Sequence, residues 1–216
     1  MALPRITVLI SGRGSNLASL VAAEKSESLG GNIRTVISNN ADAPGLAVAL
    51  AHGAAISVVD HHAYSSREDF DAALGEVIAA SQPDLIVLAG FMRIIGPALV
   101  RRFDGRMVNI HPSLLPAYPG LHTHRRALAD GVRIHGCTVH FVTPDLDHGP
   151  IVGQAAVPVF PDDSEASLAA RVLDAEHRLL PAAVRAYCDH RLVVEGRRVR
   201  VKGERRNGDA LFVPPI

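Results

Sequence analysis

An asparagine and a histidine stand two residues apart in the run Asn109-Ile110-His111-Pro112. Pro112 ends the expected strand, because proline has no backbone N–H to donate. Side chains two apart in a strand share a face, so Asn109 and His111 point the same way. An amide beside an imidazole can stabilise an oxyanion and move a proton, whereas a purely structural pair would bond to loop carbonyls. This pair alone leaves both interpretations open.

A second candidate is the glycine-rich run SGRGSNL, which follows the first apolar segment and contains Gly14, Ser15 and Asn16. Glycine permits a tight turn, and the next backbone amides then face outward at a helix N-terminus, which favours a bound phosphate. A dinucleotide-binding fingerprint would need glycine where this chain has Leu17, and the Gly-Lys-Ser/Thr of a nucleotide-binding P-loop is missing. The run therefore favours a phosphate monoester, against the alternative of a turn without ligand.

A third candidate is the loop DLDHGP, which begins at Asp145. A carboxylate here could reach the cleft and favour the charged form of His111. Asp145 could instead cap the turn, and the sequence does not choose between Asp145 and Asp147.

The elements that must position these residues are short apolar runs alternating with longer helical patterns. Strands are predicted at residues 6–11, 35–38, 56–60, 85–89, 107–111 and 138–142. Helices are predicted at residues 16–26, 43–52, 66–81, 96–102 and 122–130. This alternation predicts an α/β fold with right-handed crossovers and a doubly wound, mainly parallel, Rossmann-like sheet. Ligands bind outside the carboxyl ends of such strands, so the loops after Ile10, Ala89 and His111 should line one cleft.

The C-terminal part predicts a long helix from residue 164 to 190, broken or kinked at Pro181. Residues 192–201 alternate around Glu-Gly and predict a hairpin whose arginines protect a sheet edge. We expect one domain over residues 1–190, with a hairpin and tail over 191–216 packed on it. Residues 207–216 are expected to be poorly ordered.

Composition excludes several functions. Lys plus Arg and Asp plus Glu both number 22, so no broad positive field is available for tRNA or DNA. Cys137 and Cys188 are too few for a disulfide framework, and none of the histidine groups has acidic or cysteine neighbours at metal spacing. The apolar run at 6–10 is too short for a signal peptide or a membrane span. We expect a cytoplasmic monomer or homodimer that acts on small molecules without a metal.

These motifs together resemble the folate-dependent phosphoribosylglycinamide formyltransferases of purine synthesis. The resemblance runs from Ile6 to about Ala183 and rests on SGRGSNL, SNNADAPGL, SREDFD, LAGFMRI, NIHPSLLPAYPGLHTHRRAL and HGCTVHFVTPDLDHGPI. It implies transfer of a formyl group from 10-formyltetrahydrofolate to the amine of phosphoribosylglycinamide. No metal and no covalent enzyme intermediate are needed for that reaction.

The resemblance also implies roles for individual residues. His111 matches the catalytic acid, Asn109 a group that stabilises the oxyanion, and Asp147 the carboxylate that keeps the acid protonated. The residues that match the phosphoribosyl-substrate site are Gly14, Ser15, Asn16 and Glu176. The residues that match the formyl-folate site are Arg67, Met92, Arg93, Ile94, Ile95 and Asn109.

Two positions depart from the family pattern, and three rival functions remain. Arg13 stands where some members carry Asn, and His148 stands where many carry Gly. A methionyl-tRNA formyltransferase would be expected to carry a further C-terminal domain and a basic surface, and a formyltetrahydrofolate deformylase an N-terminal regulatory domain. A non-catalytic sensor of a phosphorylated sugar or folate would not need Asn109, His111 and Asp147 together.

Overall fold

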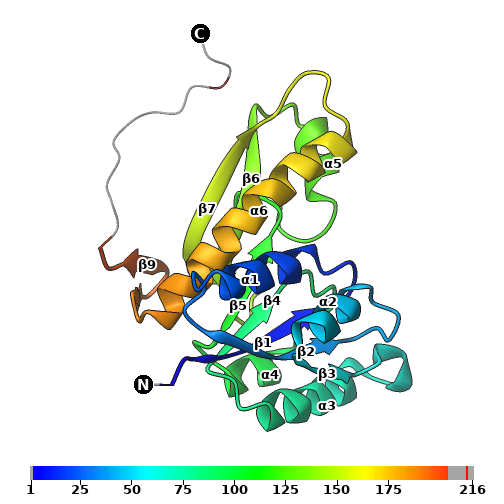
Figure 1. The fold of residues 1–216 in the computed structure, drawn as a ribbon. Helices are drawn as coiled ribbons and strands as arrows, with labels where there is room; N and C mark the ends of the chain where they lie inside the picture. The colour runs from blue at the N-terminus through cyan, green and yellow to red at the C-terminus, as the bar shows by residue number, and fades with distance from the viewer. Residues whose placement is uncertain (1, 204–212, 214–216) are drawn as a thin grey trace.

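A mixed sheet organises residues 2–203, which together with residue 213 are the part of the chain that the computed structural model describes. Its strands lie in the order β3-β2-β1-β4-β5-β6-β7-β9-β8 (Figure 1). The parallel half contains β1 (Arg5–Ile10), β2 (Asn32–Ser38), β3 (Ala55–Val58), β4 (Leu85–Leu88) and β5 (Met107–His111). The other half contains β6 (Ile134–Phe141), β7 (Ile151–Pro158), β8 (Leu192–Glu195) and β9 (Arg198–Val201).

Helices cover both faces of this sheet. The helices are α1 (Ser15–Lys25), α2 (Gly45–His52), α3 (Arg67–Ala80), α4 (Pro97–Arg102), α5 (Thr123–Ala129) and α6 (Glu165–Cys188), with a short 3-10 helix η1 (His61–Ala63). Val8 and Ile10 pack in a core with α1, α2 and α6, whereas Leu9 packs on the opposite face with α3 and α4. Among the described residues, none of the helices combines the length and the apolar character needed to cross a membrane.

The predicted doubly wound α/β sheet with a C-terminal hairpin is confirmed, but one strand direction and one strand were not predicted. β6 runs antiparallel to β5 and begins four residues before the predicted strand, at Ile134. β7 then pairs antiparallel with β6. The β7 run IVGQAAVP has small residues in its middle and only one buried side chain, so it lacks the apolar alternation that marks a strand.

The predicted break at Pro181 is wrong, because α6 continues through it to Cys188. Leu180 and Val184 on either side are buried in the core, and this packing offsets the backbone hydrogen bond that proline cannot make. Figure 1 shows α6 lying along β6 and β7. The hairpin β8–β9 joins the sheet through the pair Ile151 and Arg198. The predicted disorder of residues 207–216 falls outside the described residues, except for residue 213.

β5 sets the direction of the candidate catalytic side chains. Val108 and Ile110 are buried in the core shared with α6, so Asn109 and His111 point to the opposite face. Asn109 lies directly across from His140 on β6, and His111 lies across from Thr138. Residues directly opposite in an antiparallel pair share a face, so these four side chains gather on one surface.

The glycine-rich loop packs backbone against backbone. Gly14 has a positive φ of 74° just before α1, and a Cβ added there would lie 2.5 Å from the Cα of Gly45. The Gly45 amide, at the start of α2, also donates to the carbonyl oxygen of Gly12 at 3.0 Å. The two helix N-termini can therefore lie side by side only because neither glycine carries a side chain.

We expect Gly14→Ala to destabilise the fold by about 3 kcal/mol, because it combines left-handed backbone strain with a steric clash. Gly53→Ala is the matched control, since Gly53 also has a positive φ, of 84°, but no atom lies within 4 Å of an added Cβ. It should cost only about 1 kcal/mol. Urea unfolding of both variants measures the difference, and equal losses would contradict the close packing at Gly14.

Candidate active site

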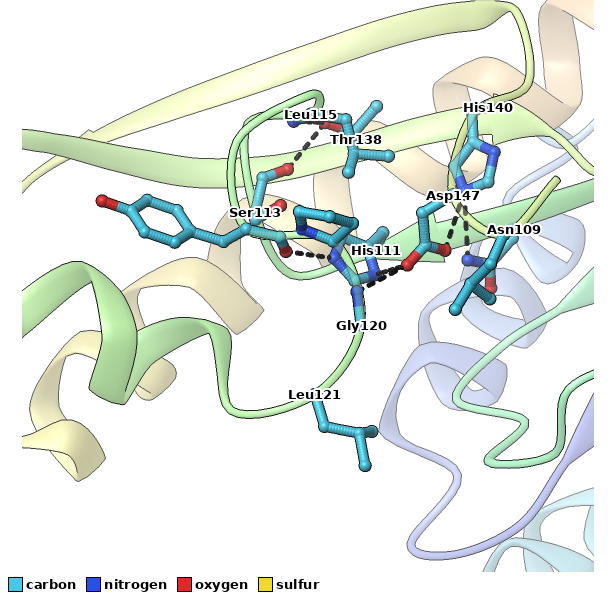
Figure 2. A network of polar contacts seen from close by, with 12 residues as sticks. Asn109, His111, Ser113, Leu115, Gly120, Leu121, Thr138, His140 and Asp147 are labelled. Atoms are coloured by element: carbon cyan, nitrogen blue, oxygen red, sulfur yellow. Dashed lines mark hydrogen bonds and ion pairs between the residues drawn. The ribbon is translucent and has the colours of Figure 1, made fainter.

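A buried carboxylate lies between two imidazoles at the end of β5. Asp147 Oδ2 is 3.6 Å from His111 Nδ1, and Asp147 Oδ1 is 3.8 Å from His140 Nε2. The side chain of Asp147 is only 7% exposed, and its Oδ2 accepts a hydrogen bond from the Gly120 amide at 2.8 Å. Figure 2 shows this carboxylate between the two rings, with Asn109 beside His140. The structure thus brings together the three residues predicted to be catalytic.

His140 is held neutral and orients Asn109. The carbonyl oxygen of Phe141 accepts from His140 Nδ1 at 2.9 Å, so Nδ1 carries the proton. The lone pair on Nε2 then accepts from Asn109 Nδ2 at 3.2 Å. Burial lowers the pKa of His140, which keeps the ring in this neutral form. One N–H of the Asn109 amide is occupied by His140, and the second makes no hydrogen bond within the described part of the chain.

His111 is fixed by a backbone carbonyl on one side and faces the carboxylate on the other. The carbonyl oxygen of Tyr118 lies 2.9 Å from His111 Nε2, so Nε2 carries a proton. The other ring nitrogen, Nδ1, faces the Asp147 carboxylate. Because 3.6 Å exceeds a normal hydrogen-bond distance, Nδ1 is not committed to Asp147 and can serve a bound molecule.

The loop that carries Tyr118 is tied to β6 by buried hydrogen bonds. Thr138 Oγ1 donates to the Ser113 carbonyl oxygen at 2.6 Å and accepts from the Leu115 amide at 3.0 Å. Ser113 Oγ donates to the Ala117 carbonyl oxygen at 2.6 Å. Ser113 and Thr138 are both fully buried, so these bonds form away from water and hold the loop firmly.

The two aspartates that the sequence left as alternatives differ in position. Asp145 is exposed, whereas Asp147 turns inward with a positive φ of 55°. His148, at the position where many family members carry glycine, is exposed and its Nδ1 donates to the Leu146 carbonyl oxygen at 2.6 Å. The inward turn at Asp147 therefore forms with a histidine at position 148.

The glycine-rich loop opens α1 as predicted. The first turn of α1 has no acidic residue and no side-chain cap, so its free backbone amides are open to an anion. Asn16 Nδ2 donates to Glu176 Oε2 at 2.7 Å, and Asn16 Oδ1 is buried with no hydrogen-bond partner among the described residues. Burial raises the pKa of Glu176 to about 6, although the bond from Asn16 opposes this. Gly14, Ser15, Asn16 and Glu176 thus belong to one region.

The residues that match the family's folate site lie on a different part of the same edge. Met92, Arg93 and Ile94 are exposed on the loop after β4, whereas Ile95 is buried. Arg67 opens α3 and, with Gly96 at the end of that loop, lines a cavity of about 230 Å³. The structure therefore brings Arg67 beside the end of the loop after β4. In the described part of the chain, no hydrogen bond or ion pair joins Arg67 to the three residues predicted to be catalytic.

One group of potential metal ligands was not expected from the sequence analysis, which found no acidic or cysteine residue at metal spacing from the histidine groups. Asp60, His61 and His62 present ligand atoms within 4.8 Å of one another. However, Asp60 Oδ1 lies 3.0 Å from both the backbone amide and the Nδ1 of His62, and His61 Nδ1 lies 2.9 Å from the Asn39 carbonyl oxygen. These atoms already have partners within the chain, so we assign them no metal.

His140 is the site residue that sequence reasoning missed. It appears in the motif HGCTVHF, but its role depends on β6 pairing antiparallel with β5 in a register that places it opposite Asn109. The only local signal was its spacing of two from Thr138, which places both side chains on one face of a strand.

Comparison with known proteins gives a consistent result. The family model described as formyl transferase matches residues 4–184. The phosphoribosylglycinamide formyltransferase of Escherichia coli strain K12 is 48% identical over 200 residues, which cover 93% of this chain and 94% of that protein. The trifunctional purine biosynthetic protein adenosine-3 of Drosophila melanogaster is 48% identical over 182 residues, or 83% of this chain and 14% of that protein.

A solved structure shows the same fold at high similarity. The crystal structure of glycinamide ribonucleotide transformylase 1 from Symbiobacterium toebii superposes with a TM-score of 0.90 at 48% identity. The superposition covers 92% of this chain and 94% of that chain.

Glu176 yields a prediction about stability and pH. Its pKa of about 6 lies above its ordinary value of 4.5, so the folded state binds the proton more tightly than the unfolded state. Its carboxylate therefore lowers stability as pH rises from 4.5 to 6, by about 2 kcal/mol in total. Glu176→Gln removes this titration. The stability of the variant relative to the parent should therefore increase by about 2 kcal/mol when the pH is raised from 4.5 to 7. Chemical unfolding at both pH values measures it, and parallel stability curves would contradict it.

Proposed function

The chain belongs to the formyl transferase family, and within it we propose that the protein transfers the formyl group of 10-formyltetrahydrofolate to the amine of 5'-phosphoribosylglycinamide. The products are formylglycinamide ribonucleotide and tetrahydrofolate, as a step of purine synthesis. Near-complete coverage of the Escherichia coli phosphoribosylglycinamide formyltransferase supports this function. The observation that carries the chemistry is the buried Asp147 carboxylate within 4 Å of His111, next to Asn109.

The first step is attack of the neutral substrate amine on the formyl carbon. The formyl oxygen gains negative charge as the carbon becomes tetrahedral. The free N–H of Asn109 and the Nδ1–H of His111 are the two donors that stabilise this charge. His140 contributes indirectly, because its Nε2 lone pair holds the Asn109 amide with its N–H groups toward the site.

The second step is departure of the folate, which requires a proton on its N10 and loss of one from the attacking nitrogen. His111 supplies the first proton as general acid, and Asp147 accepts the second, directly or through a water molecule. The C–N bond to the folate then breaks, and the formyl group remains on the substrate amine. Asp147 stays close to His111 throughout, so the pair is restored to its starting protonation by exchange with solvent.

The two substrates occupy separate parts of the strand edge. The phosphate of phosphoribosylglycinamide is bound by the α1 amides with Gly14, Ser15 and Asn16, and Glu176 helps to hold the same substrate. The folate contacts Asn109 and the exposed residues Met92, Arg93 and Ile94, with Ile95 beneath them. Arg67 supplies a positive charge for the anionic end of the folate.

A direct assay tests this function. The protein is mixed with 10-formyltetrahydrofolate and phosphoribosylglycinamide, and tetrahydrofolate release is followed by absorbance. Parallel reactions contain no acceptor, to detect a deformylase, or initiator tRNA charged with methionine, to detect a tRNA formyltransferase. Release that depends on phosphoribosylglycinamide supports the proposal, whereas release in either of the other reactions alone would replace it.

The pair His111 and Asp147 gives the sharpest catalytic prediction. His111→Ala and Asp147→Asn should each reduce kcat by about 10²–10⁴-fold, because each removes part of one acid–base unit. The double variant should be little slower than the slower single one. Both ligands should still bind, as measured by calorimetry.

His148→Ala is the matched control, since His148 lies in the same loop but is exposed and bonds only within it. Its kcat should stay within about twofold of the parent. Multiplicative losses in the double variant would show instead that His111 and Asp147 act independently.

A further inference from the structure

The segment after β4 combines exposed apolar side chains with buried anchors. Met92 and Ile94 are 70% and 54% exposed, whereas Phe91 and Ile95 are each 8% exposed and pack in the core with α3 and α4. The proposed function places the folate against these exposed side chains. Besides these buried side chains, two hydrogen bonds restrain the backbone at the ends of residues 92–95.

The first restraint comes from Ser11, at the end of β1. Its Oγ accepts a hydrogen bond from the Met92 amide at 2.7 Å and donates to Asn39 Oδ1. Its own amide donates to the Gly90 carbonyl oxygen at 3.2 Å. Ser11 stands at the start of the glycine-rich run by sequence, but its hydrogen bonds hold the start of the 92–95 segment.

The second restraint comes from Asp71, one turn into α3. Its Oδ2 accepts from the Gly96 amide at 2.7 Å, and a Cβ added at Gly96 would lie 2.6 Å from the same oxygen. Asp71 is 8% exposed, and its Oδ1 is buried with no hydrogen-bond partner among residues 2–203. Burial raises the pKa of Asp71, so the fold places this carboxyl group at some cost. A buried polar group kept at a cost, with one bond to a loop amide, indicates a positioning role.

We propose that Ser11 and Asp71 are positioning residues that fix the two ends of segment 92–95 and thereby set the affinity for formyl-folate. This inference rests on the proposed function for the identity of the ligand. A segment already held in its binding geometry loses less conformational entropy when the ligand arrives, so binding is tighter. Release of either end allows the segment to move and removes that advantage.

The test compares variants that remove each hydrogen bond with variants that keep it. Ser11→Ala should raise KM for 10-formyltetrahydrofolate on the order of tenfold and leave kcat and KM for phosphoribosylglycinamide within about twofold. Ser11→Thr keeps the hydroxyl and should restore most of the affinity. Asp71→Ala should also raise KM for the folate, and Asp71→Asn, which keeps an acceptor for Gly96, should raise it less.

Ser38→Ala is the matched control. Ser38 ends β2 beside Ile10 of β1, is fully buried, and its hydroxyl bonds to the backbone of Asn40 instead of the 92–95 segment. It should lower the melting temperature without changing KM for the folate. A folate KM that rises equally in Ser38→Ala would show general loosening and overturn the proposal.

A binding measurement separates this inference from the proposed function. Calorimetry with tetrahydrofolate alone should show weaker binding to Ser11→Ala and Asp71→Ala, with no chemistry required. If the parent binds tetrahydrofolate but transfers no formyl group to phosphoribosylglycinamide, the proposed function fails and the positioning role still stands. If Ser11→Ala instead raises KM only for phosphoribosylglycinamide, Ser11 belongs to the phosphate site and the positioning role is overturned.

Discussion

The buried carboxylate of Asp147 is the constraint around which the site is organised. A carboxylate that is 7% exposed needs donors or positive charge nearby, because burial of an unpaired charge is costly. Gly120 supplies an amide and His111 an imidazole within 4 Å, while the neutral ring of His140 lies on the other side of the carboxylate. These neighbours come from β5, from the loop that follows it and from β6. The carboxylate, on the loop after β6, therefore holds β5 and its loop against β6.

The proposed ligand-binding surfaces and the proposed chemistry lie in different parts of the sheet. The parallel half follows the usual rule for such sheets, and the loops after β1 and β4 provide the proposed ligand-binding surfaces. The proposed chemistry lies at the boundary where β5 meets the antiparallel β6, because that pairing sets Asn109 opposite His140 and His111 opposite Thr138. The antiparallel strand β6 thus places His140 and Thr138 on the same face of the sheet as Asn109 and His111.

Local patterns were sufficient to predict some of this arrangement. The spacing of Asn109 and His111 before Pro112 identified both their common face and the end of β5, and the glycine-rich run identified the start of α1. Other features depend on contacts between distant parts of the chain. The inward turn of Asp147, the pairing of His140 and the continuity of α6 through Pro181 depend on neighbours that no local pattern specifies. The strand β7 escaped prediction because its central residues are small and mostly unburied.

The close contact between Gly14 and Gly45 has a consequence for how an anion can be held. With no side chain between the two helix starts, the donors offered there are main-chain amides, which do not ionise. A phosphate ester at this place would then keep its protein partners across the whole acid range. The second ionisation of the phosphate ester, with a pKa of about 6, would instead set the lowest pH at which the ester binds tightly. The pH dependence of phosphate binding by these amides would then be a property of the substrate itself, separate from the titration of Glu176 nearby.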